Sequence, residues 1–145
     1  MDLLNRIKTL EPEYDEYYYQ FILKFTIEQG GKIGRATEED KWERGRYFST
    51  RYEMYMYATL LGMKKDYELP LEIKSKDRKS FINIGSWKPQ YIAEYIIMGI
   101  LGIGDYDLFE MEQMEEDELQ NTISNIKKDI EKYANGGLDI IKSKA

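Results

Sequence analysis

Residues 48–62 read Phe48-Ser49-Thr50-Arg51-Tyr52-Glu53-Met54-Tyr55-Met56-Tyr57-Ala58-Thr59-Leu60-Leu61-Gly62, and they predict the central helix of the fold. Thr50 can cap the first turn, and Glu53, three residues later, completes the pattern of a capping box. Gly62 can adopt the left-handed conformation that ends a helix. Apolar side chains occupy most of the circumference of this segment, which is typical of a helix packed on several sides. We therefore expect this helix at the centre of the core.

The composition limits the chemistry that this protein can perform. The chain has 145 residues, which is enough for one domain to bury roughly two thirds of its unfolded surface. It contains no cysteine and no histidine. These absences exclude disulfides, zinc sites built on Cys or His, and catalytic triads that use His. The composition therefore favours a non-catalytic protein, and we predict no cofactor and no catalytic residue.

No segment of the sequence resembles an export signal or a membrane span. The N-terminal residues Met1–Arg6 include an early acid and no long apolar run. The longest apolar stretch, Ile96–Ile103, is short and is interrupted by Gly99 and Gly102. We therefore expect a cytoplasmic protein without membrane contact.

Apolar spacing predicts a mostly α fold, a single compact helical domain over residues 1–145. A short helix before Pro12 and a longer helix over Glu13–Gln29 would form an N-terminal helical hairpin within residues 1–30. A small β-hairpin is the only β component expected. Phe81–Ile84 alternates like a strand, and Glu72–Lys74 can pair with it across a basic turn.

Glycines are expected to set the ends of the helices in the second half of the chain. One helix opens at Ser86–Pro89, and we expect the glycines at 99, 102 and 104 to break it. A short acidic helix can begin at Leu108. The last helix carries apolar residues at steps of four and three from Leu119 to Tyr133, and Asn135-Gly136-Gly137 is expected to end it.

The charges are distributed unevenly around a net charge of -6. Eight of the 27 acids lie between Gly104 and Leu119 with no Lys or Arg among them, so 19 acids face 21 basic residues elsewhere. This acidic segment has three interpretations: a solvated face, a surface that binds a basic protein, or a carboxylate site for Mg²⁺ or Ca²⁺. The candidate partner-binding residues are Glu110, Glu112, Glu115, Glu116, Asp117 and Glu118.

A basic turn follows the central helix and offers two further interpretations. Its candidate phosphate contacts are Lys74, Lys76, Arg78 and Lys79, although the net negative charge does not favour nucleic acid as the main partner. Asp66 followed by Glu72 and Lys74 superficially matches the acid and Glu-x-Lys arrangement in which nucleases hold Mg²⁺. The five residues between Asp66 and Glu72 leave little room for that geometry.

Several stretches from residue 48 onward also carry a resemblance to a known family. They are Phe48-Ser49-Thr50, the helix end Tyr57-Ala58-Thr59-Leu60-Leu61-Gly62, Pro70-Leu71, the acidic run Glu110–Glu118, and Tyr133-Ala134-Asn135-Gly136-Gly137-Leu138. With these features, residues 48–142 resemble the small accessory proteins associated with bacterial DNA phosphorothioation (Dnd, DNA sulfur modification) systems.

The resemblance implies a cellular context rather than a reaction. Such proteins are encoded near DNA modification and phage-defence genes, and the family supplies no catalytic residues to transfer to this chain. We therefore expect a non-catalytic accessory or adaptor protein whose partner is a protein of such a system. The acidic segment and the exposed part of the tyrosine-rich helices are the expected contact surfaces. A Mg²⁺-dependent nuclease and a small DNA-contacting module are the alternatives, and a homodimer is left open.

Overall fold

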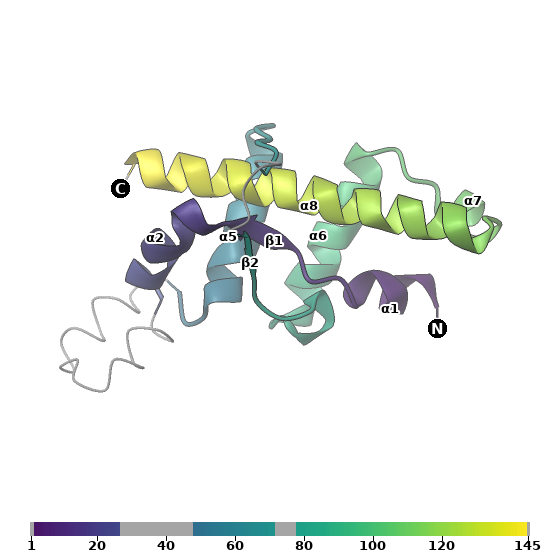
Figure 1. Ribbon diagram of the computed structural model, residues 1–145, viewed down its shortest axis with the longest axis horizontal. Coiled ribbons are helices and arrows are strands. Elements are labelled where there is room, and N and C mark those ends of the chain that lie inside the picture. The colour runs from purple at the N-terminus through teal and green to yellow at the C-terminus, as the bar shows by residue number, and fades with distance from the viewer. Residues whose placement is uncertain (1, 27–47, 72–77, 145) are drawn as a thin grey trace.

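The computed structural model describes residues 2–26, 48–71 and 78–144 (Figure 1). Within these ranges the chain is mostly helical with a minor β component, which confirms the predicted fold class. In chain order the elements are α1 (Leu3–Lys8), β1 (Glu13–Asp15), the 3-10 turn η1 (Glu16–Tyr18), α2 (Tyr19–Lys24), α5 (Arg51–Lys64), β2 (Arg78–Ser80), the 3-10 turn η2 (Ile84–Ser86), α6 (Gln90–Ile103), α7 (Leu108–Glu112) and α8 (Glu116–Lys144).

The long helix α8 runs the length of the molecule, and α5 and α6 cross it (Figure 1). The α5–α8 pair makes the most extensive contact between any two described elements. Both helices contribute fully buried side chains to the core, among them Met54, Tyr55 and Ala58 from α5 and Ile126, Ile130 and Ala134 from α8. The central position predicted for α5 is therefore confirmed.

The start of α5 follows from its local sequence. The Thr50 hydroxyl accepts a hydrogen bond from the Glu53 backbone N–H at 3.1 Å, so the predicted cap is confirmed. The Glu53 carboxylate in turn accepts from the Ser49 hydroxyl at 2.6 Å, one residue before the position that a capping box normally uses. The bond to Thr50 supplies a partner for one of the backbone N–H groups that the first turn of a helix leaves unpaired.

The two helix ends predicted at glycines are wrong, because these glycines are contact points inside helices. Helix α5 continues past Gly62 to Lys64, and α8 continues past Gly136 and Gly137 to Lys144. A Cβ at each of these glycines would overlap a backbone carbonyl oxygen, that of Tyr133 for Gly62, of Tyr67 for Gly136 and of Ala58 for Gly137. The missing side chains therefore let α8 approach α5 and the segment after it closely.

Helix α6 also continues where a break was predicted. It passes through Gly99 and Gly102 and ends at Ile103, with Gly104 as the C-cap residue. A Cβ at Gly99 would contact only the far end of the Met63 side chain, and a Cβ at Gly102 would have no neighbour within 4 Å. Glycine lowers helix stability without preventing a helix, and burial of the opposite face holds α6 in place.

The helix predicted over Glu13–Gln29 is wrong at its beginning, and it ends earlier than predicted, at Lys24. Residues 13–15 form strand β1, η1 follows, and α2 begins only at Tyr19, while residues 27–29 lie outside the described ranges. Tyr14 is buried in the middle of β1, and its ring stacks on Phe81 with the ring centroids 4.8 Å apart. Tyr14 is buried, whereas Glu13 and Asp15 on either side of it are only partly buried. This alternation along the chain is typical of a strand rather than a helix.

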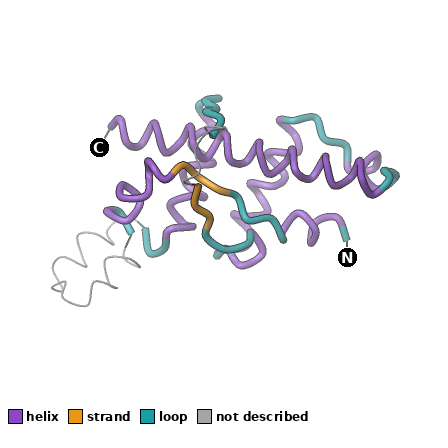
Figure 2. The backbone as a smooth tube through the Cα atoms, viewed as in Figure 1, coloured by secondary structure: helices purple, strands orange, loops and turns teal. Residues whose placement is uncertain are grey.

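The β component differs from the predicted hairpin. Strand β2 pairs antiparallel with β1, with Tyr14 opposite Lys79, and the two strands lie side by side in Figure 2. The strand prediction over Phe81–Ile84 is wrong, because β2 ends at Ser80 and the 3-10 turn η2 begins at Ile84. The other predicted strand, Glu72–Lys74, lies outside the described residues.

None of the helices in the described part of the chain combines the length and the apolar character that crossing a bilayer requires.

Candidate protein-binding surface

Helix α6 has one face in the core and another in solvent. The core face carries Ala93, Ile96, Ile97, Ile100 and Leu101, all of which are buried. On the opposite face, Tyr91, Tyr95 and Met98 are 74%, 69% and 55% exposed. Steps of three and four residues place these side chains above one another on successive turns, and Gly102 continues the same line. We call these four residues the α6 stripe.

The turn that joins α6 to α7 is held by the backbone conformation of Asp105 and by a hydrogen bond from Tyr106 to α8. Asp105 has a φ of 56°, a left-handed conformation that Asp adopts more readily than most residues. The Tyr106 hydroxyl donates a hydrogen bond of 2.6 Å to the Asp129 carboxylate on α8. Burial raises the pKa of Tyr106 above its ordinary value, and the hydrogen bond to Asp129 raises it further. This bond ties the turn to the longest helix.

Helix α7 presents Phe109 to solvent. The Asp107 carboxylate caps the helix by accepting from the backbone N–H groups of Phe109 at 2.9 Å and Glu110 at 3.3 Å. Met111 is buried in the core and anchors α7 from the other side. Phe109 is 82% exposed, the largest exposed fraction among the large apolar side chains of the described residues.

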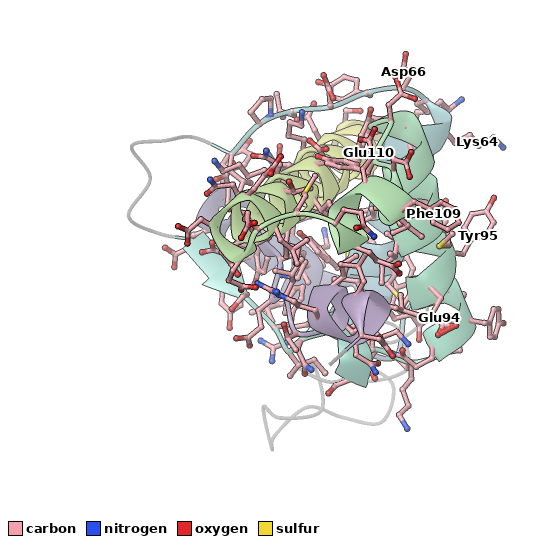
Figure 3. All side chains as sticks on the ribbon, turned by 90° about the vertical axis from the view of Figure 1, so that its right-hand side faces the viewer. Lys64, Asp66, Glu94, Tyr95, Phe109 and Glu110 are labelled. Atoms are coloured by element: carbon pink, nitrogen blue, oxygen red, sulfur yellow. The ribbon has the colours of Figure 1, made fainter. Side chains whose placement is uncertain are left out.

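Two hollows that are open to solvent flank Phe109. The first, which we call the α6–α7 hollow, measures about 560 Å³ and is lined by Met98, Leu101, Gly102, Asp105, Tyr106, Asp107, Leu108 and Phe109. The second measures about 450 Å³ and is lined by Phe109, Glu110, Gln113, Met114 and Glu118. In Figure 3, Phe109 and Tyr95 project from the same side of the molecule. Met98 and Gly102 of the α6 stripe therefore share one surface with Phe109 of α7 at the α6–α7 hollow.

All six predicted partner-binding acids are exposed, and two of them lie beside Phe109. Glu110 and Glu118 line the second hollow, which brings the two ends of the predicted set together. The remaining ones are Glu112 on α7, Glu115 in the turn, and Glu116 and Asp117 on the first turn of α8. Acids in the first turn of a helix are favoured by the helix dipole, which explains part of their clustering.

Glu116 has a structural role that its neighbours lack. Its carboxylate accepts two hydrogen bonds from the Arg6 guanidinium of α1, one of them at 3.0 Å, and Arg6 also reaches the Gln120 side chain at 3.0 Å. The Arg6 bond lowers the pKa of Glu116 below its ordinary value and raises that of Arg6. Of the eight acids in the segment, Glu116 alone has a cationic partner among the described residues.

The predicted phosphate-contacting residues are described only in part. Lys74 and Lys76 lie outside the described ranges, and Arg78 and Lys79 form the start of β2, where their backbones face Asp15 and Tyr14 of β1. For the nuclease alternative, Glu72 and Lys74 also lie outside these ranges. Both hypotheses therefore stay predictions.

A further hollow of about 460 Å³ lies between α8 and the Pro70–Leu71 segment. Two of its charged side chains pair with each other: the Lys132 ammonium lies 3.2 Å from the Asp129 carboxylate, and it also lies 3.6 Å from that of Glu68. The charge of Lys132 therefore has partners without a ligand. Across residues 2–26, 48–71 and 78–144, no group of three or more carboxylates is placed to hold a metal ion.

Sequence reasoning identified the acids but not the α6 stripe as a surface. Tyr91 and Tyr95 share helical spacing with Ile92 and Ile96, and α6 is apolar on nearly every side, so periodicity does not select the buried face. The usable signal is residue type, because Ile96, Ile97 and Ile100 face the core while Tyr and Met, which are enriched at protein interfaces, face solvent.

Comparison with known proteins supplies the context for this surface. A family model described as DNA sulphur modification system-associated protein 4 matches residues 33–145, which confirms the predicted resemblance and includes α5 to α8. No curated protein and no solved structure matches the chain.

Proposed function

The chain belongs to the family of DNA sulphur modification system-associated protein 4, and from this premise we propose that it is a non-catalytic adaptor of a bacterial DNA modification and phage-defence system. The adaptor acts through contacts with another protein of that system. The observation that supports this proposal best is the combination of the exposed α6 stripe, the exposed Phe109 and the acids on α7 and the start of α8.

Exposed apolar side chains in such a group favour a protein partner. Single exposed apolar residues are normal on protein surfaces, whereas a contiguous set rimmed by charges is typical of an interaction site. Tyr, Phe and Met are also enriched at interfaces, and one aromatic residue near the centre often contributes a large share of the binding energy. Phe109 has this position because it lies between the two hollows.

The charge of the surface favours a basic protein over DNA. The acidic segment carries eight carboxylates and no Lys or Arg, and Glu116 alone among them has a cationic partner in the described residues. DNA binding is dominated by attraction between phosphates and Lys or Arg, so this surface repels DNA. The same negative charges attract a partner that carries Lys or Arg, which increases the association rate and the specificity of binding.

Affinity purification from a host that contains the modification system tests this function. The tagged chain is recovered from nuclease-treated lysate, so that DNA cannot bridge two proteins, and the co-purified proteins are identified by mass spectrometry. We expect a component of the DNA sulphur modification machinery to co-purify with the wild type. Absence of every such component would contradict the adaptor function.

Charge reversal then tests the acidic surface. Glu118→Lys, alone and together with Glu110→Lys, should reduce recovery of that component, because both carboxylates line the second hollow. Glu11→Lys is the matched control, since Glu11 is exposed and lies between α1 and β1. Glu116 is left unchanged because its reversal would break the bond to Arg6. Equal recovery of the component by Glu118→Lys and Glu11→Lys would remove the acidic surface from the proposal.

A further inference from the structure

We propose that the α6–α7 hollow receives an apolar side chain of the partner, from a short segment in which Lys or Arg residues flank that side chain. This inference rests on the proposed function, because the segment belongs to the partner in the DNA sulphur modification system. It adds the chemistry of the partner segment and the position at which it docks.

Gly102 leaves the floor of the α6–α7 hollow open. It lies within α6, one turn after Met98, and a Cβ built on it would have no neighbour within 4 Å. Glycine is unfavourable inside a helix relative to alanine, and no steric requirement of the fold explains it here. Gly137 is different, because the backbone of Ala58 leaves no room for a Cβ at that position. The free space above Gly102 therefore suits a side chain from outside.

The walls of the hollow fit an apolar occupant. Met98, Leu101 and Phe109 all line the hollow; Leu101 is buried, whereas Met98 and Phe109 are exposed. An unbranched Met side chain adapts its shape to an inserted group, and an exposed Phe ring offers a large apolar contact. The bond from Tyr106 to Asp129 fixes the turn between α6 and α7 to α8, so the turn that lines the hollow is held in place before any partner arrives.

Charge complementarity selects the residues that flank the inserted side chain. Asp105 and Asp107 line the α6–α7 hollow, and Glu110 and Glu118 line the hollow on the other side of Phe109. None of these four carboxylates has a cationic partner within the described ranges. Lys and Arg place their apolar stems along such walls while their charged ends reach carboxylates at the rim.

The same charges argue against a second copy of this chain as the occupant. A symmetric dimer across the α6 stripe would bring the acidic segments of two chains toward each other. Like charges that face each other across an interface are unfavourable, and each copy supplies eight acids and no basic residue in this segment. A basic segment of another protein removes this repulsion.

Site-specific photocrosslinking locates the partner segment. A photoreactive phenylalanine analogue replaces Tyr95 in one full-length chain and Tyr17 in another, and both are expressed in the host with the modification system. Tyr95 and Tyr17 are equally exposed, at 69%, but Tyr17 lies in η1, far along the chain from α6 and α7. We expect a crosslink from position 95 and none from position 17, to a partner peptide in which Lys or Arg flanks an apolar residue.

Affinity measurements with that intact partner test the hollow itself. Gly102→Trp fills the hollow and Phe109→Ala removes its wall, and each should weaken binding by about tenfold or more. Gly102→Ala, which adds one methyl group in open space, and Tyr17→Ala should stay within about twofold of the wild type. Increased salt should weaken wild-type binding, since part of the attraction is ionic.

The outcomes separate this inference from the proposed function. If the wild type recovers a modification component but crosslinks to it only from position 17, or if Gly102→Trp binds normally, the docking position is wrong and the adaptor function stands. A crosslink from position 95 to a second copy of the chain, or to a peptide without Lys or Arg, also overturns the inference. If the wild type recovers no modification component, both proposals fail.

Discussion

Gly137 of α8 lies directly against the backbone carbonyl of Ala58 in α5, and a Cβ on Gly137 would come within 2.8 Å of the Ala58 Cα. Backbone cannot move aside as a flexible side chain can, so this contact requires glycine. Gly62 and Gly136 make the same kind of contact with the backbones of Tyr133 and Tyr67. The close approach of α5 and α8 therefore depends on glycines contributed by both helices.

Gly137→Ala should lower the free energy of unfolding by about 3 kcal/mol, because an added methyl group forces the two packed helices apart. The expected increase in helix propensity is smaller than this loss. Urea denaturation followed by circular dichroism measures the change. A variant as stable as the wild type would show that α8 does not approach α5 as closely as described.

Gly102→Ala is the matched change at a glycine without neighbours. No atom lies within 4 Å of the added methyl group, so only helix propensity changes. The free energy of unfolding should rise by about 0.5 to 1 kcal/mol, in the same urea measurement. A loss of stability would mean that the space above Gly102 is filled in the folded protein.

Thr50→Ala should destabilise the protein by about 1 kcal/mol, because the first turn of α5 loses its side-chain cap. Ser49→Ala removes an exposed hydrogen bond to Glu53 and should cause a smaller loss. Thermal unfolding of both variants gives the comparison. A loss for Ser49→Ala as large as that for Thr50→Ala would contradict the ranking of these two hydrogen bonds.

The protein should lose stability when the pH rises above about 10, the ordinary pKa of tyrosine. Burial raises the pKa of Tyr14, Tyr18 and Tyr55, so these side chains keep their protons in the folded protein and release them more easily when it unfolds. Their contribution to stability is fully present at a pH below the tyrosine pKa of the unfolded chain. It is lost as the pH rises through the tyrosine pKa of the folded protein.

Ultraviolet absorbance of tyrosinate, recorded together with circular dichroism during an alkaline titration, checks this expectation. A group of tyrosines should ionise only as the helical signal disappears. If all 13 tyrosines ionise while the helical signal is intact, the burial described for the core is contradicted.

Arg6→Ala should raise the pKa of Glu116 toward the ordinary glutamate value of 4.5, because the hydrogen bonds that lower it are gone. Because the pKa of Glu116 is lowered in the folded protein, the bond stabilises the fold fully at a pH above the ordinary glutamate pKa. This stabilisation is lost as the pH falls through the pKa of Glu116 in the folded protein. Nuclear magnetic resonance titration of the Glu116 carboxyl measures the shift. An unchanged pKa would show that α1 and α8 are not joined by this pair in solution.

Local signals in the sequence predicted some elements correctly and misread others that depend on tertiary contacts. The start of α5 is local, since Thr50 and Glu53 cap the helix whatever lies beside it. Glycine has two uses in helices, as a terminator and as a point of close approach, and only the packed partner separates them. For this reason the sequence pattern predicts a helix end at Gly136 and Gly137, although α8 continues through both residues. The β1–β2 pair joins residues far apart in the sequence, which local pattern does not specify.

The candidate surface was predictable in its charge but not in its apolar part. Eight acids without a basic residue are visible in the sequence, and the structure places Glu110 and Glu118 at one hollow. The exposure of Tyr95 and Met98 depends on which face of α6 the core covers. That choice depends on α5 and α8, which contact α6; Ile96 and Ile100 are buried, and the stripe lies on the opposite face.

Hydrogen–deuterium exchange of this protein, with and without the modification component that co-purifies with it, shows directly where the partner docks. We expect slower exchange in the partner's presence, concentrated in the second half of α6, in α7 and in the first turns of α8. Protection confined to α1, β1 and β2, or exchange that the component leaves unchanged throughout α6 and α7, would contradict a docking surface at Phe109 and the α6 stripe.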